Sequence, residues 1–160
     1  MHKLIIIRGN SGSGKTTLAK CLHEQYKNNS LLIDQDTIRR DMLDGSDDKA
    51  IELLLDLIKF GKINYDITIL EGILVCKKYK KLFEDIKEIY KQNEIKAYYY
   101  DLSFEETLKR HQTRNNKFEF GEDKMRSWFV EKDYLNDFNE TKFDETISIQ
   151  DALDIIKKDL

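Results

Sequence analysis

A glycine-rich segment between an apolar run and a helical pattern constrains this chain more than any other feature. Leu4 to Ile7 is continuously apolar and rich in β-branched residues, which is typical of a strand buried on both faces of a parallel sheet. Gly9 to Thr16 follows, and Lys15 to Tyr26 predicts a helix. Every fixed position of the pattern G-x-x-x-x-G-K-[ST] is therefore present, in the strand–turn–helix context that the pattern requires.

This segment has the chemistry of a phosphate-binding loop. Glycines let backbone N–H groups turn inward around phosphate oxygens, and the following helix presents its positive N-terminus to the same anion. Lys15 would reach the β- and γ-phosphates, and the Thr16 hydroxyl would bind magnesium. A chance glycine turn is the alternative, but average composition produces the pattern in on the order of one chain in a hundred. We therefore predict that ATP and Mg²⁺ bind to Gly9, Asn10, Ser11, Gly12, Ser13, Gly14, Lys15, Thr16 and Thr17.

Strand and helix patterns alternate along the rest of the chain. This alternation predicts an α/β fold, a P-loop NTPase three-layer sandwich with a mostly parallel central sheet of about five strands. Further strands are expected at 31–33, 67–70, 95–100 and, more weakly, at Thr146 to Ile149. Helices are expected at 36–42, 51–58, 79–90, from 104, from Met125 to Leu135, and after a cap at Asp151.

Composition indicates one globular domain, residues 1–160. The net charge of -3 and pI near 5.7 argue against a dedicated nucleic-acid-binding protein, although a local basic cleft remains compatible with both values. The N-terminal apolar run is too short for a signal peptide or a membrane span, so we expect a cytoplasmic protein without membrane contact. Cys21 and Cys76 lack metal-ligand spacing and are expected to be free thiols.

Two carboxylates follow the second predicted strand. Asp34 and Asp36 would lie on the same rim of the sheet as the phosphate-binding loop. Transfer to a hydroxyl group needs a carboxylate that accepts its proton, which favours Asp36 as the base. Arg39, three residues later, could face the same cleft, whereas Arg40 is expected to be a surface charge. Asp36 could instead cap the short helix, and Asp34 could bind magnesium through water or act as the cap.

The loop together with Ile33-Asp34-Gln35-Asp36-Thr37-Ile38-Arg39 resembles the small P-loop kinases that include bacteriophage polynucleotide kinase and the zeta toxins. The resemblance implies an AAA-type ATP-dependent phosphotransferase. It makes Asp36 the base, and it makes Arg39 the residue that grips the acceptor or its phosphate. It covers the chain from Leu4 to about Trp128.

Glu71 ends the third predicted strand and has two interpretations. An acidic residue at a strand end can act on magnesium or its water. The pair Glu71-Gly72 also resembles the Glu-Gly pair of zeta toxins, which implies that Glu71 contacts the acceptor. A solvent-facing acid is the third possibility.

A helical lid is expected over residues 110–126. The segment from Asp101 to Thr107 resembles the one that precedes the lid in the same kinases, where arginines neutralise charge on the transferring phosphoryl group. Arg110 and Arg114 are four residues apart and would share a helical face, with Arg126 as a further candidate. A solvated helix face is the alternative interpretation of these arginines.

Taken together, the patterns predict an ATP-dependent kinase that transfers the γ-phosphate to a hydroxyl of a small-molecule or nucleotide-like acceptor, held by Asp34, Arg39 and Glu71. A 5′-hydroxyl polynucleotide kinase is an alternative, to which the acidic pI gives less support. A regulatory ATPase or switch is another, and a toxin role stays open. The sequence contains no Asn-Lys-x-Asp motif of the kind that gives GTPases their guanine specificity. It does not indicate an oligomeric state.

Overall fold

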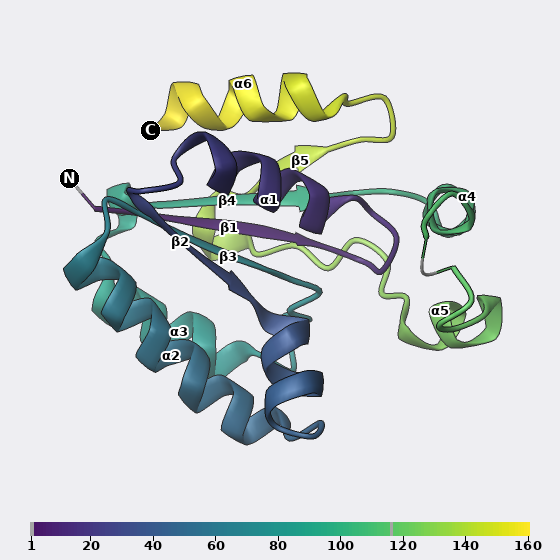
Figure 1. Ribbon diagram of the computed structural model, residues 1–160, viewed down its shortest axis with the longest axis horizontal. Helices are drawn as coiled ribbons and strands as arrows, with labels where there is room; N and C mark the ends of the chain where they lie inside the picture. Colours follow the sequence, from purple (N-terminus) through teal and green to yellow (C-terminus); the bar gives the residue numbers. More distant parts are fainter. Residues whose placement is uncertain (1, 116) are drawn as a thin grey trace.

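Five parallel strands form one sheet in the order β2-β3-β1-β4-β5 (Figure 1). The computed structural model describes residues 2–115 and 117–160, so residue 116 of the expected lid lies outside the described residues. The predicted α/β class is confirmed, and the described sheet is parallel throughout. The strands are β1 (Lys3–Gly9), β2 (Ser30–Asp34), β3 (Ile67–Gly72), β4 (Ile95–Tyr100) and β5 (Thr141–Phe143).

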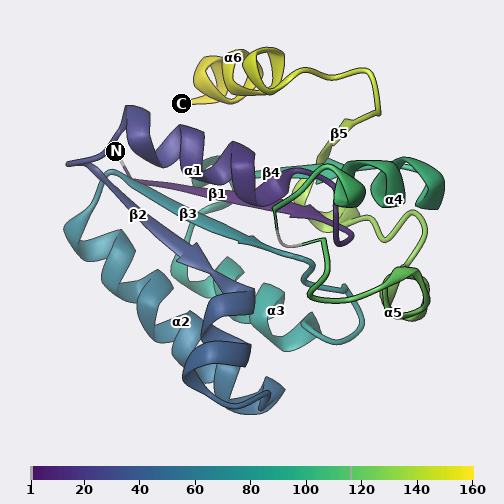
Figure 2. The same cartoon turned by 45° about the vertical axis from the view of Figure 1, so that its right-hand side comes forward.

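Alternation along the central strand creates the two cores. Leu4 and Ile6 face one side of β1, whereas Ile5 and Ile7 face the other, and all four are fully buried. Helices cover both faces, α1 and α6 on one and α2 and α3 on the other (Figures 1 and 2). These helices are α1 (Lys15–Gln25), α2 (Asp47–Asn64), α3 (Lys80–Ile89) and α6 (Ile149–Asp159).

Shorter elements cluster at the carboxyl ends of the strands and in the connections. Helices α4 and α5 lie beyond the sheet, at the end to which β1 and β4 point (Figure 1). Among the described residues, no helix combines the length and apolar character needed to cross a membrane. The remaining elements are the π-helix η1 (Thr37–Met42), the 3₁₀ helices η2 (Gln92–Glu94) and η3 (Asn136–Phe138), α4 (Phe104–Gln112) and α5 (Glu122–Trp128).

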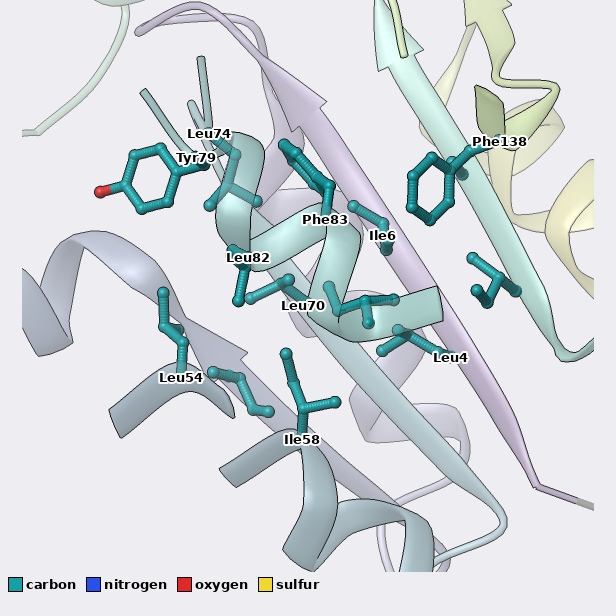
Figure 3. Close-up of a cluster of buried hydrophobic side chains, with 14 of the residues drawn as sticks. Leu4, Ile6, Leu54, Ile58, Leu70, Leu74, Tyr79, Leu82, Phe83 and Phe138 are labelled. Atoms are coloured by element: carbon teal, nitrogen blue, oxygen red, sulfur yellow. The ribbon is translucent and has the colours of Figure 1, made fainter. Parts of the chain in front are cut away.

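The core beneath α2 and α3 reaches the carboxyl edge of the sheet. Leu54 and Ile58 from α2 meet Leu82 and Phe83 from α3 over the sheet (Figure 3). The ring of Tyr79 packs at the margin of this cluster, and its hydroxyl points away from it (Figure 3). A tightly packed core of this kind fixes the strand ends, and with them the loops that carry polar side chains.

A buried arginine ties two distant segments to the end of β1. Arg8 is fully buried and pairs with Asp133 at 2.6 Å and Glu140 at 2.9 Å. Its Nε and one terminal nitrogen also donate to the carbonyl oxygen of Leu74, at 3.1 and 3.0 Å. Removing one partner from such a buried network leaves an uncompensated charge, which typically costs about 3–5 kcal/mol. The network therefore fixes the segment after β3 against the segment after α5.

The fifth strand lies earlier than the sequence predicted. The expected strand at Thr146 to Ile149 is wrong, because β5 spans Thr141–Phe143. Asp144 Oδ1 accepts hydrogen bonds from the backbone nitrogen of Thr146 at 2.8 Å and from its hydroxyl, which forms a turn at this point. Three residues give too short a pattern to be recognised without their neighbour β4.

Two predicted helix boundaries also differ. The cap of α6 is Ser148, whose Oγ accepts from the backbone nitrogen of Asp151 at 3.0 Å, so the prediction of Asp151 as the cap is wrong. The helix expected from Met125 to Leu135 ends at Trp128, and the next residue is extended. The apolar residues beyond it pack individually and do not continue a helical stripe. Both cysteines are free thiols, as predicted.

Candidate active site

The glycine-rich loop joins β1 to α1 with backbone conformations that favour glycine. Gly12 has φ of 81° and Gly14 has φ of 97°, both in the left-handed region. A Cβ at Gly12 would lie 2.5 Å from the carbonyl oxygen of Thr107 in α4. The loop thus packs directly on α4, and no side chain fits between them.

Lys15, the first residue of α1, lies buried in this loop. Its Nζ donates to the carbonyl oxygen of Asn10 at 3.3 Å. Burial lowers the pKa of Lys15, the nearby Glu71 carboxylate acts against that shift, and Arg114 adds to it. The Ser13 hydroxyl is buried without a hydrogen-bond partner among the described residues. A buried cation at the start of a helix fits a phosphate ligand, because its ammonium group and the backbone N–H groups of the helix N-terminus both donate to phosphate oxygens.

Glu71 lies against the residue predicted to bind magnesium. It is the penultimate residue of β3, which pairs with β1, and the Thr16 hydroxyl donates to its Oε1 at 2.8 Å. Burial raises the pKa of Glu71, whereas the charge of Lys15 lowers it. A carboxylate and a hydroxyl are hard oxygen ligands of the type that Mg²⁺ prefers. Of the interpretations left open above, this contact favours the one on the phosphate side.

The two aspartates after β2 have different surroundings. Asp34 Oδ1 accepts from the backbone nitrogens of Asp36 at 3.0 Å and Thr37 at 3.2 Å, so Asp34 caps the turn into η1. The Asp36 carboxylate makes no cap hydrogen bond and pairs with Arg40 at 3.1 Å. Asp34 also lies directly beside Glu71 in the strand register. The structure therefore leaves Asp36, and not Asp34, free of a capping role.

Both arginines of η1 line the cleft. Arg39 Nε lies 3.5 Å from Asp47 Oδ1, at the start of α2. Arg40 is half-exposed, contacts Asp36, and lies 3.8 Å from the Glu119 carboxylate of the loop after α4. Arg40 is exposed, as expected of a surface charge, and it also lines the cleft together with Arg39.

Arg110 connects three segments around the phosphate-binding loop. One terminal nitrogen donates to the carbonyl oxygen of Ser13 at 2.8 Å, and Nε donates to Glu106 at 2.9 Å. The other terminal nitrogen donates to the carbonyl oxygen of Glu145 at 3.2 Å. Arg114 lies two residues beyond the end of α4, so the predicted shared helical face is wrong, although both arginines line the cleft.

The loop between α4 and α5 is held by a buried imidazole. His111 Nε2 lies 3.0 Å from the carbonyl oxygen of Lys117 and 3.1 Å from that of Phe120. The ring of His111 stacks on Phe120 with centroids 4.6 Å apart, and Phe120 meets Trp128 edge-on. Arg126, the further lid candidate, contacts Glu122 and the Phe104 ring instead. In the described part of the predicted lid, residues 110–126, the chain forms the end of α4, a connecting loop and most of α5, and a lid role for this segment stays a prediction.

One cavity of about 880 Å³ is lined by residues of the phosphate-binding loop, the segment after β2, the end of β3 and the α4–α5 region. Ligand pockets in proteins typically measure about 300–1,000 Å³, so this one is large enough for two small ligands side by side. Eight cationic and four acidic side chains line it, which makes the cleft positive in an acidic protein. Sequence reasoning assigned no role to several lining residues: Lys20, Gln35, Lys78, Tyr79, Tyr100, Thr113, Phe120, Lys124, Ile147 and Ile149.

A positional signal existed for some of these missed residues. Lys78 and Tyr79 follow β3, whose end was already marked by Glu71. Ile147 and Ile149 follow β5, but the misplaced strand assigned them to the sheet. In a parallel sheet every loop that leaves a carboxyl end borders the same cleft.

Comparison with solved structures shows the same fold in several kinases. A gluconokinase from Sinorhizobium meliloti superposes with a TM-score of 0.68 at 15% identity, covering 99% of this chain and 89% of that one. The Mycobacterium tuberculosis APS kinase CysC, in complex with AMPPNP and APS, gives 0.70 at 14% identity and covers 99% and 96%. A chain of the Pnkp1/Rnl/Hen1 RNA repair complex gives 0.55 at 20% identity and covers 79% and 42%.

Sequence comparison places the chain in a family. A search of curated proteins finds no match. The predicted likeness to zeta toxins therefore stays a prediction. A family model described as an AAA domain, AAA_33, matches residues 4–93, more than half of the chain. These residues contain the phosphate-binding loop, both strand-end aspartates and Glu71. The chain belongs to the AAA_33 family of AAA domains.

Proposed function

We propose that this protein is an ATP-dependent kinase that transfers the γ-phosphate of ATP to a hydroxyl group of a second substrate. The observation that carries the proposal is that the phosphate-binding loop and Asp36 line the same cavity. The loop supplies a site for the triphosphate, and Asp36 supplies a carboxylate across from it. The kinases among the structural neighbours support this reading through their shared fold.

The residues present fit ATP and magnesium. Backbone N–H groups of the loop and the Lys15 side chain would hold phosphate oxygens. Thr16 and Glu71, with Asp34 beside them, would hold the metal. Magnesium, when bound, neutralises charge on the phosphates. Arg110 and Arg114 line the same cavity and would balance the remaining negative charge.

Asp36 would act on the acceptor. Its carboxylate would accept the proton of the acceptor hydroxyl while that oxygen attacks the γ-phosphorus and ADP departs. Arg40, at 3.1 Å, holds the carboxylate in place. Because Asp34 makes the cap hydrogen bonds of η1, the Asp36 side chain is available for this role.

The acceptor class is a hydroxyl compound of small-molecule or nucleotide-like size, in a cytoplasmic setting. A nucleic acid 5′ end is a second candidate, because the cleft combines cationic side chains with the aromatic rings of Phe120 and Trp128. The net charge of -3 gives the small molecule more weight.

A comparison of two aspartate variants tests the proposal. Purified protein would be incubated with Mg²⁺, ATP and pooled nucleosides, nucleotides, sugars, sugar acids and 5′-hydroxyl oligonucleotides, and mass spectrometry would detect a gain of one phosphate. Asp36→Asn should keep ATP binding but lose transfer by about 10²-fold or more, because the base is gone. The matched control is Asp41→Asn, an exposed aspartate of the same π-helix.

The outcomes separate the possible functions. Transfer that survives in Asp41→Asn and disappears in Asp36→Asn supports the kinase and identifies its acceptor. Equal turnover in both variants would remove the role given to Asp36. Phosphate release without any phosphorylated product would favour a regulatory ATPase.

A further inference from the structure

Three side chains form a charged cluster on the wall of the cleft that follows β2 and β3. Lys78 Nζ lies 2.8 Å from Asp47 Oδ2, and Arg39 Nε lies 3.5 Å from Asp47 Oδ1. Lys78 comes from the segment between β3 and α3, Arg39 from η1, and Asp47 from the first turn of α2. One carboxylate thus gathers two cations from separate elements at the edge of the cavity.

The position of this cluster separates it from the ATP-side cations. The phosphate-binding loop follows β1, in the middle of the sheet, and the strand order puts β3 and β2 on one side of it and β4 and β5 on the other. Arg110 contacts Ser13 and Glu145, which belong to the loop and to the β5 side. Lys78 follows β3 and Arg39 follows β2, on the opposite side of the loop, and Asp36 comes three residues before Arg39. They therefore border the space that remains for the second substrate.

The charge balance of the cluster favours an anionic ligand. Asp47 neutralises only one of its two cationic partners. Lys78 and Arg39 both line the cavity, and their side chains are 47% and 30% exposed, so a ligand can reach them. Asp47 Oδ1 is buried without a hydrogen bond among the described residues. A carboxylate placed this way holds the cations toward the cleft without cancelling their charge.

We propose that the acceptor itself carries an anionic group, a phosphate, sulfate or carboxylate, which binds between Lys78 and Arg39 while its hydroxyl faces Asp36. This inference rests on the proposed kinase function and narrows its substrate class. Asp47 acts as a positioning residue for the two cations. Charge-assisted hydrogen bonds to such a group typically change affinity by about 10- to 100-fold.

Matched acceptor pairs test the substrate class. The pairs would be a nucleoside with its 3′-monophosphate, and glucose with gluconate, each assayed with wild type, Lys78→Met, Lys78→Arg and Lys77→Met. Wild type should prefer the anionic member of at least one pair by about 10-fold or more in kcat/KM. Lys78→Met should abolish that preference through KM, and Lys78→Arg should restore most of it.

Lys77 provides the matched control. It is an exposed lysine one residue earlier and lies outside the cavity lining, so Lys77→Met should keep the preference. A wild type that phosphorylates neutral acceptors as efficiently as anionic ones would overturn the inference and leave the kinase proposal intact. Equal losses on both members of a pair in Lys78→Met would overturn it as well.

A binding measurement decides the inference independently of transfer. Protein saturated with Mg²⁺ and a non-hydrolysable ATP analogue would be titrated with inorganic pyrophosphate, and backbone amide shifts near residue 78 would be followed by NMR. Binding that weakens at least 10-fold in Lys78→Met but not in Lys77→Met supports an anion site even if no acceptor is phosphorylated. Absence of binding, or equal binding in both variants, would contradict it.

Discussion

Burial sets the charge state of the two central residues of the site. Lys15 and Glu71 both lie out of solvent, and burial moves the pKa of each toward its neutral form, down for Lys15 and up for Glu71. Their mutual attraction opposes both shifts. A triphosphate beside Lys15 and a cation beside Glu71 would stabilise both charged forms. The site is thus electrostatically suited to a ligand pair that places negative charge beside Lys15 and positive charge beside Glu71.

This arrangement predicts a pH dependence for Mg·ATP binding. The raised pKa of Glu71 means that its carboxyl takes up a proton at a higher pH than its ordinary value of 4.5. Because magnesium needs the charged form, affinity should fall as the pH falls through that raised pKa. Glu71→Gln should weaken Mg-dependent ATP binding by about 10- to 100-fold and flatten the pH dependence. Isothermal titration calorimetry between pH 5 and 8 would measure both effects.

The control for this prediction is an exposed glutamate. Glu105→Gln, in the first turn of α4, should retain the affinity and pH profile of the wild type. Titration of ATP itself contributes equally to all three proteins, so differences between the variants isolate Glu71. Unchanged affinity in Glu71→Gln would place this residue away from the metal and return it to the acceptor side.

At the scale of elements, the phosphate-binding loop and α4 form one unit. Gly12 has positive φ, and its Cα faces the carbonyl oxygen of Thr107. Gly12→Ala should therefore strain the backbone by about 1–2 kcal/mol and also push the loop away from α4. We expect at least a 10-fold loss of ATP affinity, together with faster amide hydrogen exchange in α4.

Gly121 offers the matched substitution. It lies in the segment before α5, with φ of -96°, and no atom lies within 4 Å of an added Cβ. Gly121→Ala should leave both ATP affinity and exchange in α4 close to wild type. If Gly12→Ala binds ATP as tightly as Gly121→Ala does, the contact between the loop and α4 does not shape the site.

Elements with long periodic patterns could be predicted from the sequence, and short ones could not. The β-branched run of β1, the helical stripes of α2 and α3 and the Ser103 cap of α4 can all be recognised in the sequence. The three-residue β5 exists because Tyr98 to Tyr100 offer it an edge to pair with, which is a tertiary effect. Arg114 was expected on a helix, but α4 ends at Gln112.

The candidate site shows the same division. The position of the glycine-rich loop and of Asp36 at one cleft could be predicted, because a local motif and a strand end specify it, while their roles stay predictions. Arg40, from the π-helix, and Lys78, from the segment before α3, also line the cleft, but no motif in the sequence marks them. No spacing in the sequence encodes the ion pair between Lys78 and Asp47, which are 31 positions apart.

Over the whole molecule, the cleft is positive although the protein is acidic. The net charge of -3 indicates nothing about the cavity, where eight cations face four acidic side chains. Such a distribution attracts anionic ligands to one place while the remaining surface repels them. The sheet makes this possible, because loops from all its strands deliver side chains to a single edge.

Ligand binding in this cleft should stabilise the folded protein, which gives a last prediction. A ligand at 100 times its Kd stabilises the folded state by about 2.7 kcal/mol. For a chain of 160 residues, each kcal/mol raises Tm by about 2–4 °C. Saturating Mg·ATP should thus raise Tm by roughly 5–11 °C. Differential scanning fluorimetry of wild type and Lys15→Ala, with and without Mg·ATP, would measure the effect.

The Lys15→Ala variant tests whether the Tm shift arises from binding at the phosphate-binding loop. Lys15→Ala removes the buried cation, so the same nucleotide concentration should produce little change in its Tm, whereas Lys77→Ala should behave like wild type. A full shift in Lys15→Ala would mean that nucleotide stabilises the protein from another site. Arg110 of α4 bonds to this loop and to Glu145, so nucleotide bound to the loop should also stabilise these segments, which lie far apart in the chain. The stabilisation should therefore appear as one cooperative shift of the whole unfolding transition.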